Sequence, residues 1–130
     1  MKNIFQFTHK VSPEDIDDLN HVNNLKYLEW ALKAAGLHWL EMSDAATRKK
    51  YVWVVARHEI DYFKPAFEGD EIHIKTWIDE MEKASSIRIV EIYKGDKLIA
   101  KVKTTWVLLD AATGRVSRIP AEFDKFIRTD

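Results

Sequence analysis

A dense cluster of polar residues, from Asp15 to Asn24, lies directly before a stretch of the chain with helical spacing. Within it, Asp17 and His21 stand four residues apart, and Asn24 follows at the predicted start of the helix. A carboxylate and an imidazole are common general acid–base groups. The first turn of a helix presents unpaired N–H groups that can polarise a carbonyl oxygen. Asp17, His21 and Asn24 are therefore the candidate catalytic residues, and the chemistry they suit is acyl transfer.

The plainer interpretation of this cluster is a solvated turn followed by a helix cap, because Asp and Asn favour both for local reasons. Two features argue against it. The cluster adjoins a helix that must be buried, and it combines a titratable pair with a helix start. Asp15 and Asp18 are expected to be structural, and either Asn20 or Asn23 can supply the capping oxygen.

The helix that follows is predicted over residues 24–40 and is apolar over most of its circumference. Its expected buried face recurs at steps of three and four residues: Leu25, Leu28, Leu32, Ala35 and Trp39. Further apolar residues widen that face: Tyr27, Trp30, Ala31 and Ala34. Such a helix must be enclosed rather than rest on one surface. The polar segment 41–50 is expected to be a connection or a short second helix.

Strands are predicted on both sides of the helix. One precedes it at residues 4–11, and four follow it at residues 52–63, 71–80, 86–93 and 97–109. Short turns such as Lys94-Gly95-Asp96 join the later strands, which indicates an antiparallel sheet, and residues 119–127 close the chain. The expected fold class is α+β, with the sheet curled around one long central helix in a single domain, residues 1–130.

The string D-x-D-x-x-x-H-V-N-N-x-x-Y-x-x-W, from Asp15 to Trp30, with the later segment Tyr62 to Asp70, resembles the hotdog-fold thioesterases. The closest branches are the 4-hydroxybenzoyl-CoA thioesterase group and the acyl-ACP thioesterases. The resemblance implies a hotdog fold of five or six antiparallel strands around one helix. It also implies a homodimer, or a homotetramer built from two dimers, whose sheets join edge to edge and whose active sites lie at the dimer interface.

The resemblance also implies a role for each candidate catalytic residue. Asp17 would attack the thioester or activate the attacking water, His21 would assist, and the backbone N–H of Asn24 would polarise the carbonyl. Two departures stand out. Leu19 replaces an asparagine of the acyl-ACP branch, and residues 65–67 offer no counterpart of its later glutamate. Asp17 and His21 must then carry more of the chemistry.

The implied activity is hydrolysis of acyl-CoA or acyl-carrier-protein thioesters. Arg57, His58 and Lys64 are the candidate substrate-binding residues, because cations can meet coenzyme A phosphates or an acidic carrier protein and His58 can line the pocket. Arg88 is a weaker candidate of the same kind, more readily taken as a solubilising charge. The remaining histidines are interpreted as ordinary surface or strand residues: His9, His38 and His73. The five tryptophans are expected in the core and subunit contacts, with one or two bounding an acyl pocket.

The composition limits the expected partners, cofactors and cellular location. The formal net charge is −1 with the charges interspersed, so neither nucleic acid nor a membrane surface is an expected partner. Cysteine is absent, which excludes disulfides, thiolate catalysis and Cys-based zinc sites. No metal or cofactor is expected. We find no signal-peptide pattern or membrane-spanning stretch, so a cytoplasmic protein is expected.

Two other functions remain open from the sequence. Some hotdog proteins hydrate enoyl thioesters, but those hydratases place an Asp and a His five residues apart around an Asn-Pro pair, whereas Asp17 and His21 are four apart with no proline between them. The third possibility is a non-catalytic protein that binds acyl thioesters. It would bind acyl-CoA without turnover.

Overall fold

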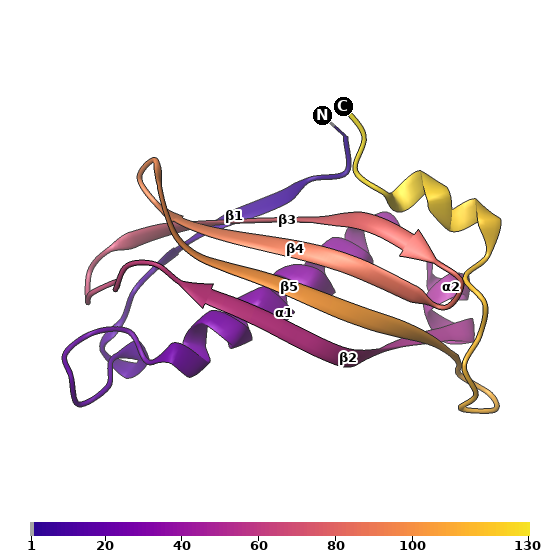
Figure 1. Ribbon diagram of the computed structural model, residues 1–130, viewed down its shortest axis with the longest axis horizontal. Helices are drawn as coiled ribbons and strands as arrows, with labels where there is room; N and C mark the ends of the chain where they lie inside the picture. The colour runs from indigo at the N-terminus through magenta and orange to yellow at the C-terminus, as the bar shows by residue number, and fades with distance from the viewer. Residues whose placement is uncertain (1) are drawn as a thin grey trace.

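The computed structural model describes residues 2–130 and has one long helix against a five-stranded sheet (Figure 1). The main elements are β1 (Phe5–Lys10), α1 (Asn24–Met42), β2 (Tyr51–Tyr62), β3 (Glu71–Glu82), β4 (Ser85–Lys94) and β5 (Lys97–Asp110). Three short helices complete the chain: η1 (Pro13–Asp15), α2 (Ala45–Lys50) and η2 (Ala121–Phe126). Each predicted strand agrees with an observed strand within two residues at either end, and the polar segment does contain a short helix.

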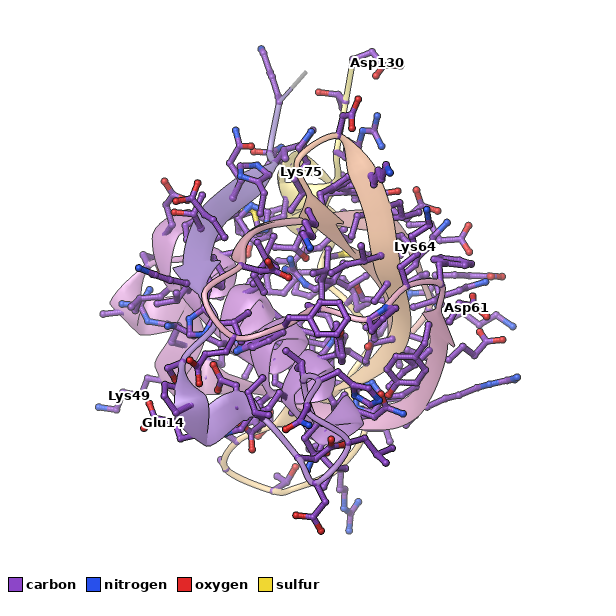
Figure 2. All side chains as sticks on the ribbon, turned by 90° about the vertical axis from the view of Figure 1, so that its left-hand side faces the viewer. Glu14, Lys49, Asp61, Lys64, Lys75 and Asp130 are labelled. Carbon is purple, nitrogen blue, oxygen red and sulfur yellow. The ribbon has the colours of Figure 1, made fainter. Side chains whose placement is uncertain are left out.

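The sheet is antiparallel and its strand order is β1-β3-β4-β5-β2. β2 therefore pairs with β5 rather than with its sequence neighbour β3, and no other strand of residues 2–130 pairs with its second edge. The helix α1 lies across one face of the sheet, which curls around it in the end-on view (Figures 1 and 2). The expected α+β hotdog fold is confirmed.

One prediction about α1 is wrong. Leu25 is 68% exposed and Leu32 is 38% exposed, although both belong to the predicted buried face. The buried residues of α1 are Tyr27, Trp30, Ala31, Ala34, Ala35 and His38. All of them except His38 belong to the predicted face or to the residues expected to widen it. Alanines let the helix approach the strands closely, and the aromatic rings fill the space beside them. The leucines lie on a flank of α1 that a single chain leaves uncovered.

Two apolar clusters make up the core. The larger joins α1 to the middle of the sheet through residues such as Ile74, Ile92 and Val102. The smaller is closed by η2, whose Phe123 and Phe126 pack with Ile78, Leu108 and Trp39. No helix among the described residues is long and apolar enough to cross a membrane.

Candidate active site

A tight loop holds Asp17 and His21 across from each other. Ile16 and Val22 form an antiparallel bridge at its base, and the N–H of Asp17 donates to the carbonyl oxygen of His21 over 3.0 Å. Asn20 adopts a φ of 63° and donates its N–H to the carbonyl oxygen of Asp17. Asn readily adopts this left-handed conformation, which lets the chain turn back within a few residues. The spacing of four residues therefore brings both side chains together.

The Asp17 carboxylate lies beside the His21 imidazole. Asp17 Oδ1 is 3.7 Å from His21 Nδ1, and the backbone N–H of Leu19 donates to the same carboxylate oxygen over 2.9 Å. The two side chains are 28% and 31% exposed, so a substrate can reach both. No group of three or more potential metal ligands occurs among residues 2–130. The pair can act as a positioned base with a neighbouring imidazole.

The start of α1 offers a hydrogen-bond donor next to this pair. The side chain of Asn23 caps the helix by accepting the N–H of Leu25, and the N–H of Lys26 donates to the carbonyl oxygen of Asn23. The N–H of Asn24 has no hydrogen-bond partner among the described residues. The hydroxyl of Tyr62 donates to the carbonyl oxygen of Asn24, which ties the end of β2 to the helix start. The cap thus leaves one backbone donor for a ligand.

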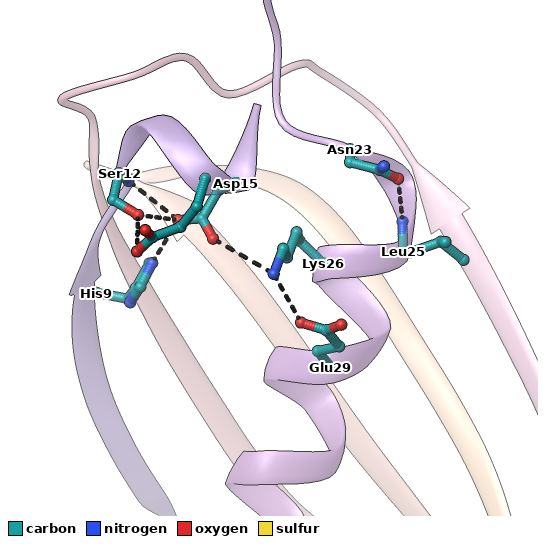
Figure 3. Close-up of polar contacts among 8 residues, drawn as sticks. His9, Ser12, Asp15, Asn23, Leu25, Lys26 and Glu29 are labelled. Carbon is teal, nitrogen blue, oxygen red and sulfur yellow. Dashed lines mark hydrogen bonds and ion pairs between the residues drawn. The ribbon is translucent and has the colours of Figure 1, made fainter. Parts of the chain in front are cut away.

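Asp15 anchors the segment that leads into the loop containing Asp17 and His21 (Figure 3). Its carboxylate is 2.9 Å from His9 Nε2 and accepts the N–H and hydroxyl of Ser12, while Lys26 Nζ lies 3.9 Å away. Its carbonyl oxygen accepts the N–H of Asn23. Burial alone would raise the pKa of Asp15, but the hydrogen bonds from His9 and Ser12 outweigh it and lower the pKa. Asp15 is a positioning residue, as the sequence suggested.

Replacing Asp15 by asparagine should therefore destabilise the protein. We expect the free energy of unfolding at pH 7 to fall by about 1–3 kcal/mol, because the hydrogen bonds to His9 and Ser12 are made to a charged group. Urea denaturation measures this, with Glu14→Gln as the matched control, since Glu14 accepts from Ser12 at an exposed position. Equal losses in both variants would show that Asp15 does not anchor the segment.

The three candidate substrate-binding residues lie on or just after β2. His58 is half-buried and its Nδ1 is 2.8 Å from the hydroxyl of Thr104, and burial lowers its pKa. Arg57 is exposed and pairs with Glu59. Neighbouring residues in a strand point to opposite faces, so Arg57 and His58 cannot share one ligand on one face. Lys64 is exposed beyond the end of β2 and lies with Asp61 along one side of the molecule, away from Glu14 (Figure 2).

A cavity of about 320 Å³ opens between α1 and the sheet, toward the C-terminal part of the helix. Three of the five tryptophans line it (Trp39, Trp53 and Trp106), together with apolar residues such as Leu32 and Ile78. Leu32 follows Asn24 by eight residues, which corresponds to about 12 Å along the helix. The cavity and the Asp17–His21 pair therefore lie at different points along α1.

Two residues of the cavity region were misread from the sequence. Arg88 is 4% exposed rather than a solubilising charge, and His38 is fully buried rather than an ordinary surface residue. Arg88 Nη1 donates to His38 Nδ1 over 2.9 Å and to the hydroxyl oxygen of Thr76 over 3.0 Å. Burial, followed by the charge of Arg88, lowers the pKa of His38 to about 4. Neutral His38 can then accept the hydrogen bond from the guanidinium.

The lowered pKa of His38 makes stability depend on pH. The unfolded chain binds a proton near pH 6.5 and the folded chain only near pH 4, so this contribution to stability is complete above pH 6.5 and is lost as the pH falls toward 4. We expect the loss at pH 4 to approach about 3 kcal/mol. Urea midpoints measured between pH 7 and 4 should show a shallower decline in His38→Gln than in wild type. His73→Gln, at a partly exposed histidine whose hydrogen bond to Gln6 is at the surface, should retain the wild-type decline. A His38→Gln profile parallel to wild type would contradict the assignment.

Known proteins resemble this chain over most of its length. The thioesterase-like superfamily matches residues 11–127. The long-chain acyl-CoA thioesterase FadM of Escherichia coli is 28% identical over 118 residues, which cover 87% of this chain and 89% of FadM. An acyl-[acyl-carrier-protein] hydrolase of Cuphea viscosissima, FATB3, is 30% identical over 58% of this chain, but the match spans only 19% of its own length.

Solved structures agree with the fold. The crystal structure of YbaW, a probable thioesterase from Escherichia coli, superimposes with a TM-score of 0.82 at 26% identity, covering 95% of this chain and 98% of its own. An acyl-ACP thioesterase from Bacteroides thetaiotaomicron gives a TM-score of 0.87 at 17% identity, covering 98% of this chain and 54% of its own. The second likeness, at this low identity, concerns the fold alone.

Proposed function

The chain belongs to the thioesterase-like superfamily, and from that membership we propose that it is a cytoplasmic enzyme that hydrolyses acyl-CoA or acyl-carrier-protein thioesters. The observation that carries the proposal is the Asp17–His21 pair, held 3.7 Å apart beside a helix start whose Asn24 N–H has no partner among the described residues. The likeness to FadM over nearly its whole length supports a CoA thioester. The alternative, a carrier-protein thioester, rests on the likeness to the plant acyl-carrier-protein thioesterases, and the match covers only about a fifth of their length.

The proposed reaction places the thioester carbonyl oxygen on the N–H of Asn24. Asp17 either removes a proton from the attacking water or attacks the carbonyl carbon itself. In the first route the water oxygen forms the new C–O bond, the C–S bond breaks, and the leaving thiolate takes up the proton. In the second route the Asp17 carboxylate forms a mixed anhydride as the C–S bond breaks, and water then hydrolyses the anhydride, which releases the acid, restores Asp17 and supplies the proton for the thiolate. Thiolate is a good leaving group, so the departing side needs no strong acid. The N–H donor stabilises the oxyanion, a contribution typically of roughly 10²–10³ in rate.

In this proposal His21 supports Asp17. The backbone N–H of Leu19 supplies the hydrogen bond that an asparagine side chain at position 19 could otherwise give to Asp17. The Leu19 side chain is 72% exposed and has no polar group, but its N–H donates to Asp17 Oδ1. A positioned carboxylate therefore does not require an asparagine side chain at position 19. His21 Nδ1 lies 3.7 Å from Asp17 Oδ1, beyond direct hydrogen-bond distance, and 3.2 Å from the carbonyl oxygen of Val22. We therefore propose that His21 assists Asp17 through the electrostatic field of the imidazole.

Lys64 and Arg57 are proposed to meet the phosphates of coenzyme A or the acidic face of a carrier protein. Both are exposed on the β2 side of the molecule, and Lys64 follows Tyr62, which contacts the helix start. His58 is proposed to line the acyl path instead, because it shares its strand face with Ile60, which packs against the core.

We further propose that the chain acts as a homodimer, or as a tetramer of such dimers, joined through β2. Among the described residues β2 has an edge without a partner strand, and it carries the exposed residues Val52, Val54 and Val55. Val52 lines the same cavity as the exposed Leu32 of α1. An unpaired apolar edge strand favours pairing with another copy. Light scattering coupled to size exclusion should give at least twice the mass of one chain, and a monomeric mass would refute this part.

A substrate panel tests the activity. Purified protein is incubated with CoA and carrier-protein thioesters of varied length while released thiol and the enoyl absorbance of crotonyl-CoA are followed separately. We expect thiol release from one or more saturated acyl thioesters. Loss of the enoyl absorbance without thiol would identify a hydratase, and tight acyl-CoA binding with no turnover across the panel would identify a non-catalytic binding protein.

A further inference from the structure

The cavity beside the C-terminal part of α1 has an unusual charge composition. Its lining is mainly aromatic and aliphatic, but it includes two arginines, Arg48 and Arg88, and neither aspartate nor glutamate. Arg48 donates to the carbonyl oxygens of Leu40 and Ser43, so backbone acceptors at the end of α1 occupy it. Arg88 is the cation in the interior of the cavity.

Arg88 has no counter-ion among residues 2–130. Its hydrogen bonds go to two neutral acceptors, His38 Nδ1 and the hydroxyl oxygen of Thr76, and no carboxylate of the described residues lies within ion-pair distance. The hydroxyl proton of Thr76 is itself committed to the carbonyl oxygen of Ile89. A guanidinium stays charged at neutral pH even where burial lowers its pKa to about 10. A buried charge without a partner is costly, so its retention needs an explanation.

A second donor without a partner belongs to a residue of the same cavity lining. Trp106 lines the cavity, and its buried indole N–H has no hydrogen-bond partner among the described residues. Trp106 on β5 is directly opposite Ser86 on β4, and Ser86 and Arg88 lie two residues apart on one strand face. Such diagonal neighbours lie about 7–8 Å apart, so a ligand group between them can reach both donors. Ser86 adds a hydroxyl to this part of the lining.

We propose that this cavity binds an aliphatic carboxylate, with the carboxylate on Arg88 and the Trp106 indole N–H and the chain against Leu32, Trp39 and Trp53. The donors match an anion with acceptor oxygens, and the planar guanidinium suits a carboxylate. The remaining lining matches a hydrocarbon chain. The site is separate from the Asp17–His21 pair and does not depend on hydrolysis.

Two sources could supply this carboxylate. One is a free fatty acid, which is also the product of the proposed reaction. The other is the distal carboxylate of a dicarboxylic acid held as a thioester at its opposite end. The binding chemistry is the same for both, and the turnover comparison described below separates them.

The test compares two ligands that differ only at the head group. Dodecanoate and 1-dodecanol are titrated into the full-length protein below their micellar concentrations, with tryptophan fluorescence and calorimetry as readouts. Wild type should bind dodecanoate about 10-fold or more tightly than dodecanol, because the carboxylate makes charge-assisted hydrogen bonds. Binding is measured without turnover, so its outcome is independent of whether the protein is a thioesterase.

Three variants locate the carboxylate. Arg88→Met should abolish the preference for dodecanoate, while Arg115→Met, at an exposed arginine outside the cavity, should retain it. Trp106→Phe removes the indole N–H together with part of the ring volume, so both ligands lose contacts with the ring but only dodecanoate loses a hydrogen bond. Dodecanoate binding should therefore weaken about threefold to tenfold more than dodecanol binding. Trp106→Phe also serves as the test if Arg88→Met does not fold.

The proposal is overturned if wild type binds the two ligands equally or binds neither, or if the preference persists in Arg88→Met and Trp106→Phe alike. The source is then decided by turnover. A higher kcat/KM for a dicarboxylic acid monothioester than for the unsubstituted acyl-CoA of equal length, lost in Arg88→Met, identifies the distal carboxylate of the substrate. Equal kcat/KM values with dodecanoate binding intact identify the free acid.

Discussion

Replacing Asp17 by asparagine should lower kcat for acyl thioester hydrolysis by about 10²–10⁴-fold, because a positioned general base typically contributes that much. Asparagine keeps the size of the side chain and can still accept the N–H of Leu19, so the loop should retain its shape. Thiol release from a saturating acyl-CoA measures the effect. KM should change little, because the carboxylate acts on the reacting atoms rather than on the bulk of the substrate.

Asp18→Asn is the matched control for this experiment. Asp18 is the next residue in the same loop and is exposed, so its replacement removes an equal charge without touching the Asp17–His21 pair. It should keep nearly wild-type kcat, and both variants should unfold at the wild-type temperature to within a few degrees. Wild-type turnover in Asp17→Asn would remove Asp17 from the chemistry, whichever reaction the protein performs.

Replacing Phe123 by alanine should lower the free energy of unfolding by about 3–5 kcal/mol, the usual cost of truncating a buried phenylalanine. Phe123 is 1% exposed. The centroid of its ring lies 5.6 Å from the ring centroid of Trp39, 5.7 Å from that of Tyr51 and 5.2 Å from that of Phe126. Trp39 and Tyr51 also line the cavity beside α1. The substitution should therefore loosen a wall of the cavity as well as the core.

Chemical denaturation of Phe123→Ala measures the loss, with Phe67→Ala as the control. Phe67 is 45% exposed and has Lys94 over its ring, so its truncation should cost no more than about 1 kcal/mol. A Phe123→Ala protein as stable as Phe67→Ala would mean that η2 does not close the smaller apolar cluster.

The elements of the fold could be predicted because each has a local signature. Period-two alternation marked the strands, as in β3, where Ile72, Ile74, Thr76 and Ile78 are all buried. The pairing of β2 with β5 could not be predicted from local signatures, because it joins segments about fifty residues apart. Short turns alone favour pairing between strands that follow each other in the sequence. The prediction for α1 was wrong at Leu25 and Leu32, which were placed on the buried face but are exposed. Spacing alone does not distinguish leucine from alanine, whereas the small alanine side chains let the helix pack closely on the sheet.

The candidate site likewise has a part that the sequence predicts and a part that it does not. The loop containing Asp17 and His21 and the cap at Asn23 are local, and the structure brings the pair together as the spacing suggested. The contact between Arg88 and His38 joins residues fifty positions apart, one on a strand and one on a helix. No sequence motif predicts this contact. A buried arginine without a carboxylate partner is visible only once the surrounding side chains have been placed.

The central claim is that this chain splits acyl thioesters with water, and isotope incorporation tests it most directly. A long-chain acyl-CoA is incubated with trace amounts of wild-type protein in H₂¹⁸O, and the products are quantified over many turnovers. We expect one free thiol for each free acid, with one ¹⁸O in the acid carboxylate. Acyl-CoA that stays intact, or that is consumed without release of thiol and labelled acid, would contradict the claim.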